Sequence, residues 1–546
     1  MSKHFLAYLE ESIKQYWDRP VMSDIDGDTH LTYATFSQEI YRLHVLFESM
    51  GIQKGDKIAL CSGNCANWAL SFMAVAACRG VVVSILADFK PESIHGLVNH
   101  SEAKVFIVNP HIFSNLNVDE MPGLQAVLSM KDFSLLSSKD ENIVKAHANW
   151  DAAFAAKYPN GISKEDVDFP KDNLDDLCLI NYTSGTTSDP KGVMVSYGNL
   201  SSNTQYALET VRVLPGDTLV SMLPLAHMFG LEFEFIYPVS GGCHVHFLNK
   251  TPAAPVLMKA FADVKPYMFL TVPLVIEKIF KKAIFPKINK PIMKILWHIP
   301  GIGGMIKKTI KEKLLTTFGG NLRYLIVGGA ALSSDVENCL RDIKFPYCVG
   351  YGMTECAPLI AYKDWREFKK GSCGAIVDRM EIKIDSKNPY KEVGEIMVRG
   401  ANVMQGYYKN PSATNAVLTP DHWLRTGDLG IIDKQNNVFI KGRSKNMILG
   451  PSGQNIYPEE LEDKINGMPF VVESIVLQRE GALTALVYPD YDAAKTAGVN
   501  IEEAMEQNRL AVNKMVPNFC QIKTVELVKS EFEKTPKRSI KRFLYK

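Results

Sequence analysis

The sequence predicts an α/β protein, with a large N-terminal domain of helix-covered β-sheets and a small α+β domain at its C-terminal end. From Lys57 onward, short apolar runs alternate with helix-like segments, which is typical of parallel sheets covered by helices. A chain of 546 residues is also too long for one compact core. Finally, a polar, basic and glycine-containing stretch at 439–453 precedes about a hundred residues with their own alternation, which indicates a separate small domain.

The large domain begins with strands and helices in quick succession. Short apolar runs rich in β-branched residues predict strands, and longer runs between them predict helices. The predicted strands lie at 58–60, 81–86, 105–109, 124–130, 177–180, 219–223, 244–248, 267–272 and 323–329, with helices at 65–78, 91–100 and from about Ser196.

Polar loops follow directly on the apolar runs that end near 180, 223, 327 and 349. Ligands of parallel α/β sheets bind at the carboxyl ends of the strands. We therefore expect the functional residues of the large domain to lie in these four loops.

We place the domain boundary inside the polar stretch, giving an N-terminal domain of residues 1–442 and a C-terminal domain of residues 443–546. The second domain contains predicted strands at 474–478, 483–489 and 522–528 and a predicted helix at 501–515. This mixture favours a small α+β unit.

Composition excludes several classes of protein. The 61 Lys and Arg residues balance 60 Asp and Glu residues, which argues against bulk nucleic-acid binding. The ten cysteines form no CxxC pair, which favours free thiols in a reducing compartment. Residues 1–20 carry acids among apolar residues, unlike a signal peptide, and the longest apolar stretch, 68–78, is too short to span a bilayer. We expect a cytoplasmic protein.

The loop at 181–192, NYTSGTTSDPKG, carries the clearest chemical signal. Its backbone N–H groups, hydroxyls and one ammonium are the groups that hold polyphosphate oxygens. It is not a Walker loop, because Pro190 precedes Lys191 and Gly192 follows it. The same residue types also make ordinary surface turns, but a lysine behind so dense a run of hydroxyls favours a phosphate site. The candidate residues are Thr183, Ser184, Gly185, Thr186, Thr187 and Lys191.

Five further segments could contact a nucleotide, and each also has an ordinary structural interpretation. LIVGGAAL at 325–332 would let a flat ligand lie against backbone, or is a tight strand-to-helix turn. GYGMTE at 350–355 could stack a base, bind phosphate and hold Mg²⁺, although a lone glutamate is more often a surface charge. LRTGDL at 424–429 offers a carboxylate to ribose hydroxyls, and GRSK at 442–445 is basic. The histidine of PLAHMFG, 224–230, is a functional candidate or a packed core residue.

The order and spacing of these segments resemble the adenylate-forming superfamily of acyl-CoA synthetases, firefly luciferases and nonribosomal adenylation domains. The resemblance covers residues 10–546 and is greatest to long-chain fatty-acyl-CoA synthetases, on the segment TVPLVIEKIF at 271–280. It implies a ligase that uses ATP and Mg²⁺ to convert a medium- or long-chain fatty acid into an acyl-adenylate. Coenzyme A then accepts the acyl group, and an acyl-carrier protein is the alternative acceptor. The resemblance further implies a mobile C-terminal domain.

The resemblance also implies roles for individual residues. The nucleotide would contact the loop residues named above together with Gly329, Ala330, Tyr351, Gly352, Thr354, Asp428 and Arg443. Catalytic roles fall on His227, Thr354, Glu355 and Lys537, with Thr186 and Glu355 holding the metal. Lys445 would be the hinge between the domains, and Gly450 and Gly453 would line the coenzyme A channel.

An inserted helical region follows residue 280. The segment 278–313 carries many lysines among Ile, Phe, Met and Trp residues. Such a basic, apolar surface could rest on anionic lipid at the inner membrane face and take up fatty acid there, or it could be a solvated helical face. The lysines are 281, 282, 287, 290, 294, 307, 308, 311 and 313, together with Lys278.

The C-terminus departs from the family pattern Thr-Pro-x-Gly-Lys-Ile, whose lysine bonds the acyl carboxylate and the α-phosphate. This chain places Ser539 at the lysine position. On an extended segment Lys537 and Lys541 would point to the same side as residue 539, so either could substitute. The alternative is a degenerate protein that binds nucleotide and acyl group without completing the reaction.

Overall fold

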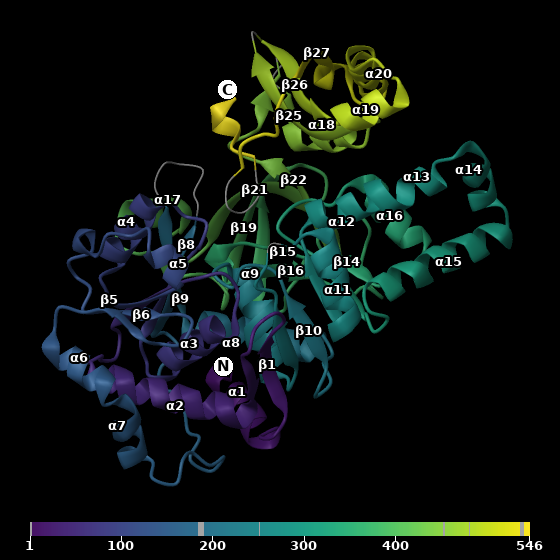
Figure 1. Cartoon of the computed structure of the whole chain (residues 1–546). Coiled ribbons are helices and arrows are strands. Elements are labelled where there is room, and N and C mark those ends of the chain that lie inside the picture. The colour runs from purple at the N-terminus through teal and green to yellow at the C-terminus, as the bar shows by residue number, and fades with distance from the viewer. Residues whose placement is uncertain are drawn as a thin grey trace.

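The computed structural model describes residues 3–183, 190–250, 252–450, 454–479, 481–534 and 540–545. Figure 1 shows a large body of helix-covered sheets, with a small unit formed by the C-terminal residues above it. The predicted α/β class is confirmed: parallel sheets with helices packed on them form the body, and an α+β unit follows.

One sheet of the large body has the strand order β20-β9-β8-β4-β3-β5-β6-β7. The strands from β8 to β6 are parallel, whereas β7, β9 and β20 pair antiparallel with their neighbours. Every residue of β4 is buried, as expected for a continuous apolar strand covered on both faces. The bounds are β3 Lys57–Cys61, β4 Val81–Ile85, β5 Ala103–Val108, β6 Ala126–Ser129, β7 Leu135–Ser137, β8 Leu177–Thr183, β9 Lys191–Ser196 and β20 Gly406–Tyr407.

A second sheet has the order β14-β13-β12-β10-β11-β1-β2. Its strands from β14 to β1 are parallel, and β2 pairs antiparallel with β1. The bounds are β1 Pro20–Asp24, β2 His30–Thr32, β10 Thr218–Ser221, β11 His244–Phe247, β12 Met268–Thr271, β13 Tyr324–Val327 and β14 Tyr347–Val349.

Helices cover and separate these sheets. Helix α3 is apolar around its whole circumference and is buried, because it packs against β3 and β4 of one sheet and β1 of the other. Helices α2 and α8 begin at capping boxes formed by Thr32 with Thr35 and by Ser196 with Asn199. The bounds are α1 Phe5–Gln15, α2 Tyr33–Ser49, α3 Ala66–Ala77, α4 Pro91–Ser101, α5 Pro110–Phe113, α6 Glu141–Ala148, α7 Trp150–Lys157, α8 Tyr197–Thr210, α9 Met228–Leu231, α10 Tyr237–Ser240, α11 Ala254–Val264, α12 Pro273–Ile279, α13 Phe285–Ile288, α14 Pro291–His298, α15 Ile302–Thr317, α16 Ser334–Asp342 and α17 Pro411–Val417, with π-helices at Glu232–Ile236 and Phe280–Ile284.

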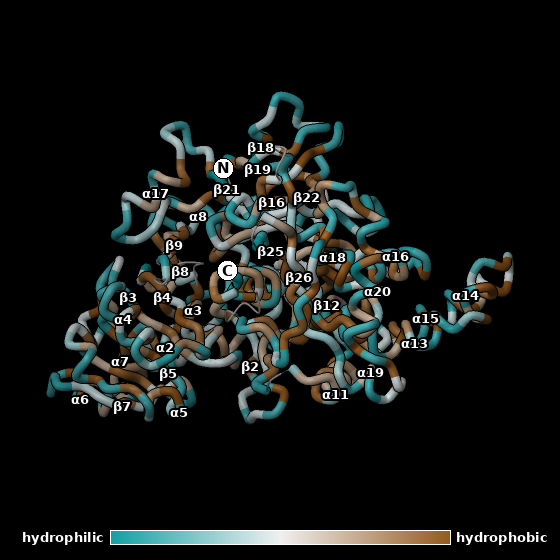
Figure 2. Tube along the Cα trace, turned by 90° about the horizontal axis from the view of Figure 1, so that it is seen from above, coloured by the Kyte–Doolittle hydropathy of each residue, from teal (hydrophilic) through white to brown (hydrophobic). Residues whose placement is uncertain are grey.

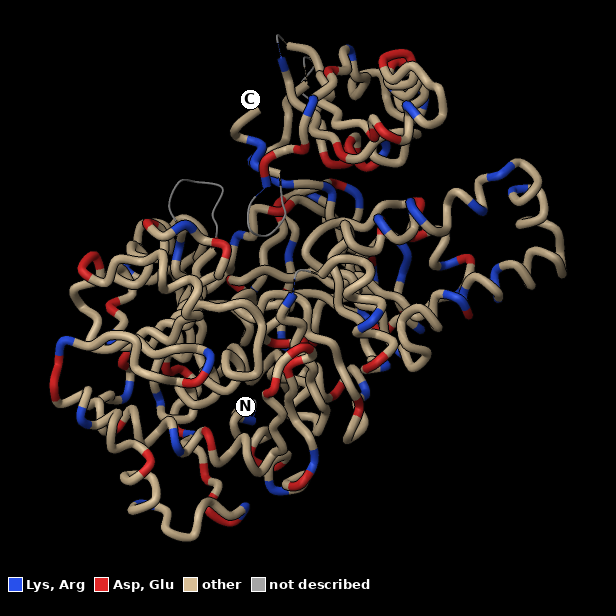
Figure 3. The backbone as a smooth tube through the Cα atoms, viewed as in Figure 1, with Lys and Arg blue, Asp and Glu red and all other residues tan. Residues whose placement is uncertain are grey.

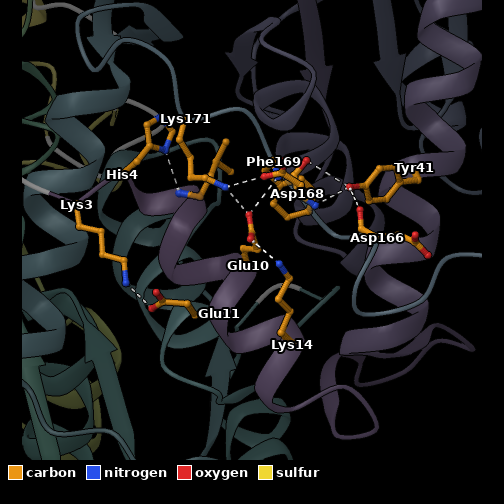
Figure 4. Close-up of polar contacts among 11 residues, drawn as sticks. Lys3, His4, Glu10, Glu11, Lys14, Tyr41, Asp166, Asp168, Phe169 and Lys171 are labelled. Atoms are coloured by element: carbon orange, nitrogen blue, oxygen red, sulfur yellow. Dashed lines mark hydrogen bonds and ion pairs between the residues drawn. The ribbon is translucent and has the colours of Figure 1, made fainter.

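Helix α1 ties the segment that leads into β8 to the large body (Figure 4). The Glu10 carboxylate accepts hydrogen bonds from the Phe169 backbone N–H at 3.2 Å and from the Lys171 ammonium at 2.5 Å. The Tyr41 hydroxyl of α2 donates to the Asp166 carbonyl at 3.0 Å. These contacts fix a segment that has no regular secondary structure of its own.

Antiparallel sheets follow the parallel part, and the sequence pattern did not reveal them. Strand β18 shows why: its burial alternates and most of its residues are partly exposed, so it lacks a continuous apolar run. The polar stretch interpreted as a linker also begins inside β22, where Val438 is fully buried. The bounds are β15 Tyr351–Gly352, β16 Leu359–Tyr362, β17 Ala375–Ile376, β18 Met380–Asp385, β19 Gly394–Gly400, β21 Leu424–Ile432 and β22 Val438–Arg443.

The C-terminal unit has a core of its own around Leu461, Val476, Ala485 and Val512. Its sheet has the order β25-β26-β27, and the predicted strands and the predicted helix at 501–515 are present. The boundary after residue 442 stays a prediction. The bounds are β23 Ile448–Leu449, β24 Asn455–Ile456, α18 Pro458–Asn466, β25 Val471–Arg479, β26 Ala482–Pro489, α19 Tyr491–Ala497, α20 Ile501–Asn513 and β27 Ile522–Leu527.

Within the described residues, no helix is both long enough and apolar enough to cross a bilayer. All ten cysteines belong to the described part of the chain, and each has a free thiol.

Candidate functional site

Several of the predicted loops lie together at one edge of the second sheet. Strands β10, β12, β13 and β14 are parallel neighbours, so their carboxyl ends meet at the same edge. The segments 222–227, 328–330 and 350–355 begin in the loops after β10, β13 and β14, and the last of them continues into the short strand β15. The prediction that the polar loops follow strand ends is therefore confirmed for these three loops.

The loop 222–227 is joined to the first sheet by buried polar side chains. The Asn181 amide, at the middle of β8, donates to the Ala226 carbonyl at 2.8 Å. Ser84 of β4 donates to the same carbonyl at 3.3 Å. Asn64 donates to the Leu223 carbonyl at 2.7 Å and accepts from a backbone N–H two residues further on. These contacts bring the carboxyl ends of the two sheets together around one loop.

The other half of this loop is held by Glu234 of the π-helix Glu232–Ile236. Its Oε2 accepts from the Ser221 hydroxyl at 3.1 Å and from the N–H groups of Met222 and Leu223, each at 2.9 Å. Burial raises the pKa of Glu234 well above its usual range. The three donors satisfy one oxygen of the buried carboxyl, and they fix the backbone that leads to His227.

The predicted phosphate loop connects two antiparallel strands. Thr183 pairs with Lys191 in the register of β8 and β9, and the Thr183 hydroxyl donates to the Lys191 carbonyl at 3.5 Å. A hairpin connection differs from a Walker loop, which leads directly into a helix. Ser184, Gly185, Thr186 and Thr187 lie outside the described residues.

Tyr407 links the two charged residues of the site and was not predicted from the sequence. Its hydroxyl donates to Oε1 of Glu355 at 2.9 Å. The Lys191 ammonium lies over its ring, 4.9 Å from the centroid. Strand β20 pairs with β9, which brings Tyr407 beside residues more than two hundred positions earlier. Burial, and next the Glu355 charge, raise the pKa of Tyr407 well above its usual range, so it stays a hydroxyl donor.

Tyr351, Asp428 and Arg443 form a second cluster. The Tyr351 hydroxyl donates to Oδ2 of Asp428 at 2.7 Å, and Nε of Arg443 forms an ion pair with Oδ1 at 2.9 Å. Asp428 and Arg443 face each other across β21 and β22. Burial raises the pKa of Asp428, and the guanidinium opposes this effect. The structure therefore brings together three residues that the sequence placed in separate motifs.

Backbone is exposed where the sequence predicted contact with a flat ligand. Gly329 and Ala330 are both exposed after β13, and Gly329 has a φ of +84°, which favours glycine. Gly352 pairs with β16, where a Cβ would lie 2.4 Å from the Pro358 carbonyl oxygen. A side chain at either glycine would strain or displace the backbone.

The two remaining candidates on this edge are His227 and Thr354. His227 is half-buried and immediately precedes α9, while Thr354 is buried at the start of the short 3₁₀-helix Thr354–Cys356. Glu355 follows Thr354 directly, so the hydroxyl and the carboxylate of the GYGMTE segment enter the site from one turn.

Lys445 is exposed in the turn between β22 and β23, and Gly450 is buried with its N–H bonded to the Gln454 carbonyl at 2.8 Å. Gly453 and Lys537 lie outside the described residues, as does Ser539. Lys541 forms an ion pair with Glu533 inside the small unit. In this arrangement the Lys541 ammonium is therefore committed to a carboxylate of its own unit.

The small unit contacts the large body mainly through α18. Lys281 donates to the carbonyls of Asn466 and Val471 at 3.1 and 3.3 Å, so its ammonium lies at the C-terminal end of α18. Ser334 donates to Oδ2 of Asp463 at 2.9 Å. Burial lowers the pKa of Lys281. The sequence predicts this lysine as part of the basic surface of residues 278–313, but the structure places it at a contact between the two units.

Glu355 fits the requirements of Mg²⁺. Tyr407 occupies only Oε1 of this half-buried carboxylate, and magnesium is commonly shared between one carboxylate and the phosphates of a substrate. No group of three or more His, Cys, Asp and Glu side chains suited to a metal occurs among the described residues.

Comparisons with known proteins agree with the motifs. The family profile described as AMP-binding enzyme matches residues 9–408. The chain is 28% identical to long-chain-fatty-acid–CoA ligase 1 of Saccharomyces cerevisiae, covering 97% of this chain and 81% of the relative. It is 26% identical to 4-coumarate–CoA ligase of Pinus taeda, covering 87% and 82%. The crystal structure of the anthranilate CoA ligase AuaEII with anthranoyl-AMP superposes with a TM-score of 0.81 at 18% identity, covering 100% of this chain and 96% of that one.

Proposed function

The chain belongs to the AMP-binding enzyme family, and on this premise we propose that it is an ATP-dependent fatty acid–CoA ligase. The observation that carries the proposal is the contact of Lys191 and Glu355 with the same side chain, Tyr407. A cation for phosphate oxygens and a carboxylate for a divalent metal are thereby held on either side of one ring. This is the pairing that nucleotide activation needs, because such reactions depend on positioned charges more than on a protein nucleophile.

In the first half-reaction, an oxygen of the fatty-acid carboxylate attacks the α-phosphorus of ATP. The bond from that phosphorus to the bridging oxygen breaks, and pyrophosphate leaves with the electron pair. Lys191 and the loop from Thr183 would hold the β- and γ-phosphates. Glu355, with Thr186 in the family pattern, would hold Mg²⁺, which neutralises phosphate charge when bound. Thr354 would contact the α-phosphate.

The nucleoside would lie along the same edge. The exposed backbone of Gly329 and Ala330 would face the adenine on one side and Tyr351 would face it on the other. Asp428 would accept hydrogen bonds from the ribose hydroxyls, with Arg443 holding the carboxylate in its charged form.

In the second half-reaction, the thiol sulfur of coenzyme A attacks the acyl carbonyl carbon. AMP leaves with the electron pair, and the thiol proton is released. His227 would order the acyl carboxylate or gate the path of the thiol, and Gly450 with Gly453 would line that path. Lys445 is proposed as the hinge about which the small unit turns between the two half-reactions.

A medium- or long-chain fatty acid is the proposed acyl substrate. The yeast relative is named for long-chain fatty acids, and it matches nearly the whole chain. The 4-coumarate ligase of Pinus taeda matches at similar identity, so an aromatic acid is the necessary comparison substrate. We propose a cytoplasmic location for the reaction, with coenzyme A as the acceptor and an acyl-carrier protein as the alternative.

A second candidate function is favoured by one observation: Ser539 stands where the family has a lysine. A serine cannot supply the charge that bonds the acyl carboxylate and α-phosphate. The protein would then bind ATP and fatty acid but form acyl-adenylate slowly. Lys537 is the candidate for the missing charge, because Lys541 is paired with Glu533.

The test is incubation of the purified protein with ATP, Mg²⁺ and fatty acids of increasing chain length, with 4-coumarate as comparison and with or without coenzyme A. Acyl-CoA formation with a maximum at one chain length is the expected result. Acyl-AMP that accumulates until a carrier protein is added would identify the other acceptor.

If ATP binds but no acid yields AMP, the ligase proposal fails. The Ser539→Lys variant then tests the second candidate function. A large gain of pyrophosphate release in this variant would establish the degenerate protein. Unchanged release in Ser539→Lys, together with loss in Lys537→Ala, would assign the missing charge to Lys537.

A further inference from the structure

Helices α14 and α15 form a hairpin that projects from the large body (Figure 1). The hairpin is well anchored: Trp297 is buried, and its Nε1 donates to Oδ2 of Asp342 on α16 at 2.9 Å. A Cβ at Gly303 would lie 2.3 Å from the Trp297 carbonyl oxygen, so the two helices are in close contact. Gly301, with a φ of +83°, makes the turn between them. The projection is therefore part of the ordered fold.

The outer end of this hairpin is apolar and exposed. Side chains are exposed by 71% at Ile292, 66% at Ile295 and 64% at Met305, and Ile299 and Ile302 at the turn are also exposed. We call these five residues the hairpin tip. The spacing of Ile292, Ile295 and Ile299 places them on one stripe of α14 and its turn. Figure 2 shows the hydrophobic colour at the far end of the hairpin.

Lysines flank the hairpin tip along the chain. The segment 281–313 contains nine lysines and a single acidic residue, Glu312. Lys290 and Lys294 are exposed at the start of α14 and on it, Lys282 is exposed in the π-helix Phe280–Ile284 that precedes the hairpin, and Figure 3 shows positive charge along the hairpin. Lys281 takes no part, because it is bound to the small unit.

We propose that the hairpin tip docks on a bilayer containing anionic lipid. Exposed aliphatic side chains flanked by lysines match a bilayer interface, where the apolar groups enter the acyl region and the ammonium groups meet headgroup phosphates. A nucleic acid would use the lysines but leave the five aliphatic side chains in water, so lipid is favoured. The biological use of this surface rests on the proposed function: a ligase docked in this way would collect fatty acid from the bilayer.

The experiment is flotation of the full-length protein with vesicles of phosphatidylcholine alone or of phosphatidylcholine with phosphatidylglycerol. One variant combines Ile292→Asn, Ile295→Asn and Met305→Asn, and a second combines Lys282→Gln, Lys290→Gln and Lys294→Gln. Matched controls change exposed residues elsewhere: Val144→Asn, Leu510→Asn and Met515→Asn in one protein, and Lys387→Gln, Lys391→Gln and Lys434→Gln in the other.

The unaltered protein and both controls should float with the anionic vesicles, and binding should weaken with salt. The tip variant should bind at least about tenfold more weakly, because three apolar side chains no longer enter the bilayer. The lysine variant should lose about fivefold for each lysine at low salt. Equal flotation of the variants and their controls, or no flotation of the unaltered protein, would overturn the proposal. So would a loss of duplex DNA binding in the lysine variant while its vesicle binding is unchanged.

Failure of this proposal can be told from failure of the proposed function. Flotation needs no ATP and no turnover, whereas ligation of a water-soluble medium-chain acid needs no vesicles. A tip variant that ligates the soluble acid at the normal rate but loses activity on vesicle-bound fatty acid would support both. A protein that floats with the vesicles but ligates no acid would support the docking surface and contradict the proposed ligase function.

Discussion

Replacing Tyr407 with phenylalanine isolates one hydrogen bond at the centre of the site. The change removes the hydroxyl that donates to Glu355 at 2.9 Å and keeps the ring beneath the Lys191 ammonium. A hydrogen bond to a charged group contributes about 1.5–3 kcal/mol. If the carboxylate must be oriented to hold Mg²⁺, acyl-adenylate formation should slow by about 10- to 150-fold. The apparent affinity for Mg²⁺ should fall in parallel.

The measurement is pyrophosphate release at saturating ATP and fatty acid over a series of Mg²⁺ concentrations. Tyr408→Phe is a matched control, because the neighbouring tyrosine also donates to a carboxylate, Glu102, at 3.0 Å, but on the exposed surface. This control should keep the normal rate and the normal Mg²⁺ dependence. Thermal unfolding of both variants separates a loss of function from a loss of folding.

A double-mutant cycle with Glu355→Gln tests whether Tyr407 acts through the carboxylate. If it does, adding Tyr407→Phe to Glu355→Gln should cost little more than Glu355→Gln alone. Rates for Tyr407→Phe within about twofold of those for Tyr408→Phe would refute the reasoning, since an effect of about 1.5 kcal/mol corresponds to more than tenfold.

Three further changes test other parts of the structure. Glu234→Gln keeps an acceptor for the three donors and should leave the free energy of unfolding in urea nearly unchanged. Glu234→Met leaves the donors without an acceptor and should lower that free energy by several kcal/mol, about 1–3 for each buried donor. Equal stability of the two variants would show that Glu234 does not hold the loop. Lys281→Met removes the donor to the carbonyls of Asn466 and Val471. The small unit should then separate more readily from the large body, and the radius of gyration from X-ray scattering should rise. An unchanged radius would show that this contact does not hold the two units together. Burial lowers the pKa of His44 to about 4, so the unfolded chain takes up its proton first as the pH falls below about 6.5, and stability should drop by about 2 kcal/mol between pH 6.5 and 5. His44→Gln should remove this part of the slope, and parallel curves for the two proteins would contradict the assignment.

The sequence was sufficient for the parallel strands because burial on both faces imposes a continuous apolar run. Strand β4 is the clearest case, with all of Val81–Ile85 buried. Strand β18 of the antiparallel sheet that follows was missed because one of its faces meets solvent and charged residues interrupt its apolar ones, over Met380–Asp385. The same limit explains why the polar stretch at 439 looked like a linker when it begins inside β22.

For the candidate site, the sequence predicts residues that each belong to a short motif within one segment. It misses residues that come to the site from other strands and helices. Glu355, Asp428 and Lys191 each belong to a short motif with recognisable chemistry. Tyr407, Asn64 and Glu234 do not, because their roles depend on strand pairing and helix packing between segments far apart in the chain. A tyrosine in a polar segment is uninformative until β20 is known to pair with β9.

Because a hairpin connects β8 and β9, the proposed phosphate site depends strongly on Tyr407. A Walker loop gains positive potential from the helix that follows it, whereas strand dipoles largely cancel, so a phosphate bound as we propose would depend more on the ammonium of Lys191. A carboxylate partner would hold that ammonium in place but would neutralise it. The face of an aromatic ring attracts the cation and leaves its charge available to a phosphate. The hydroxyl of the same ring is then free to orient Glu355, so one neutral side chain positions both the cation and the carboxylate without cancelling either.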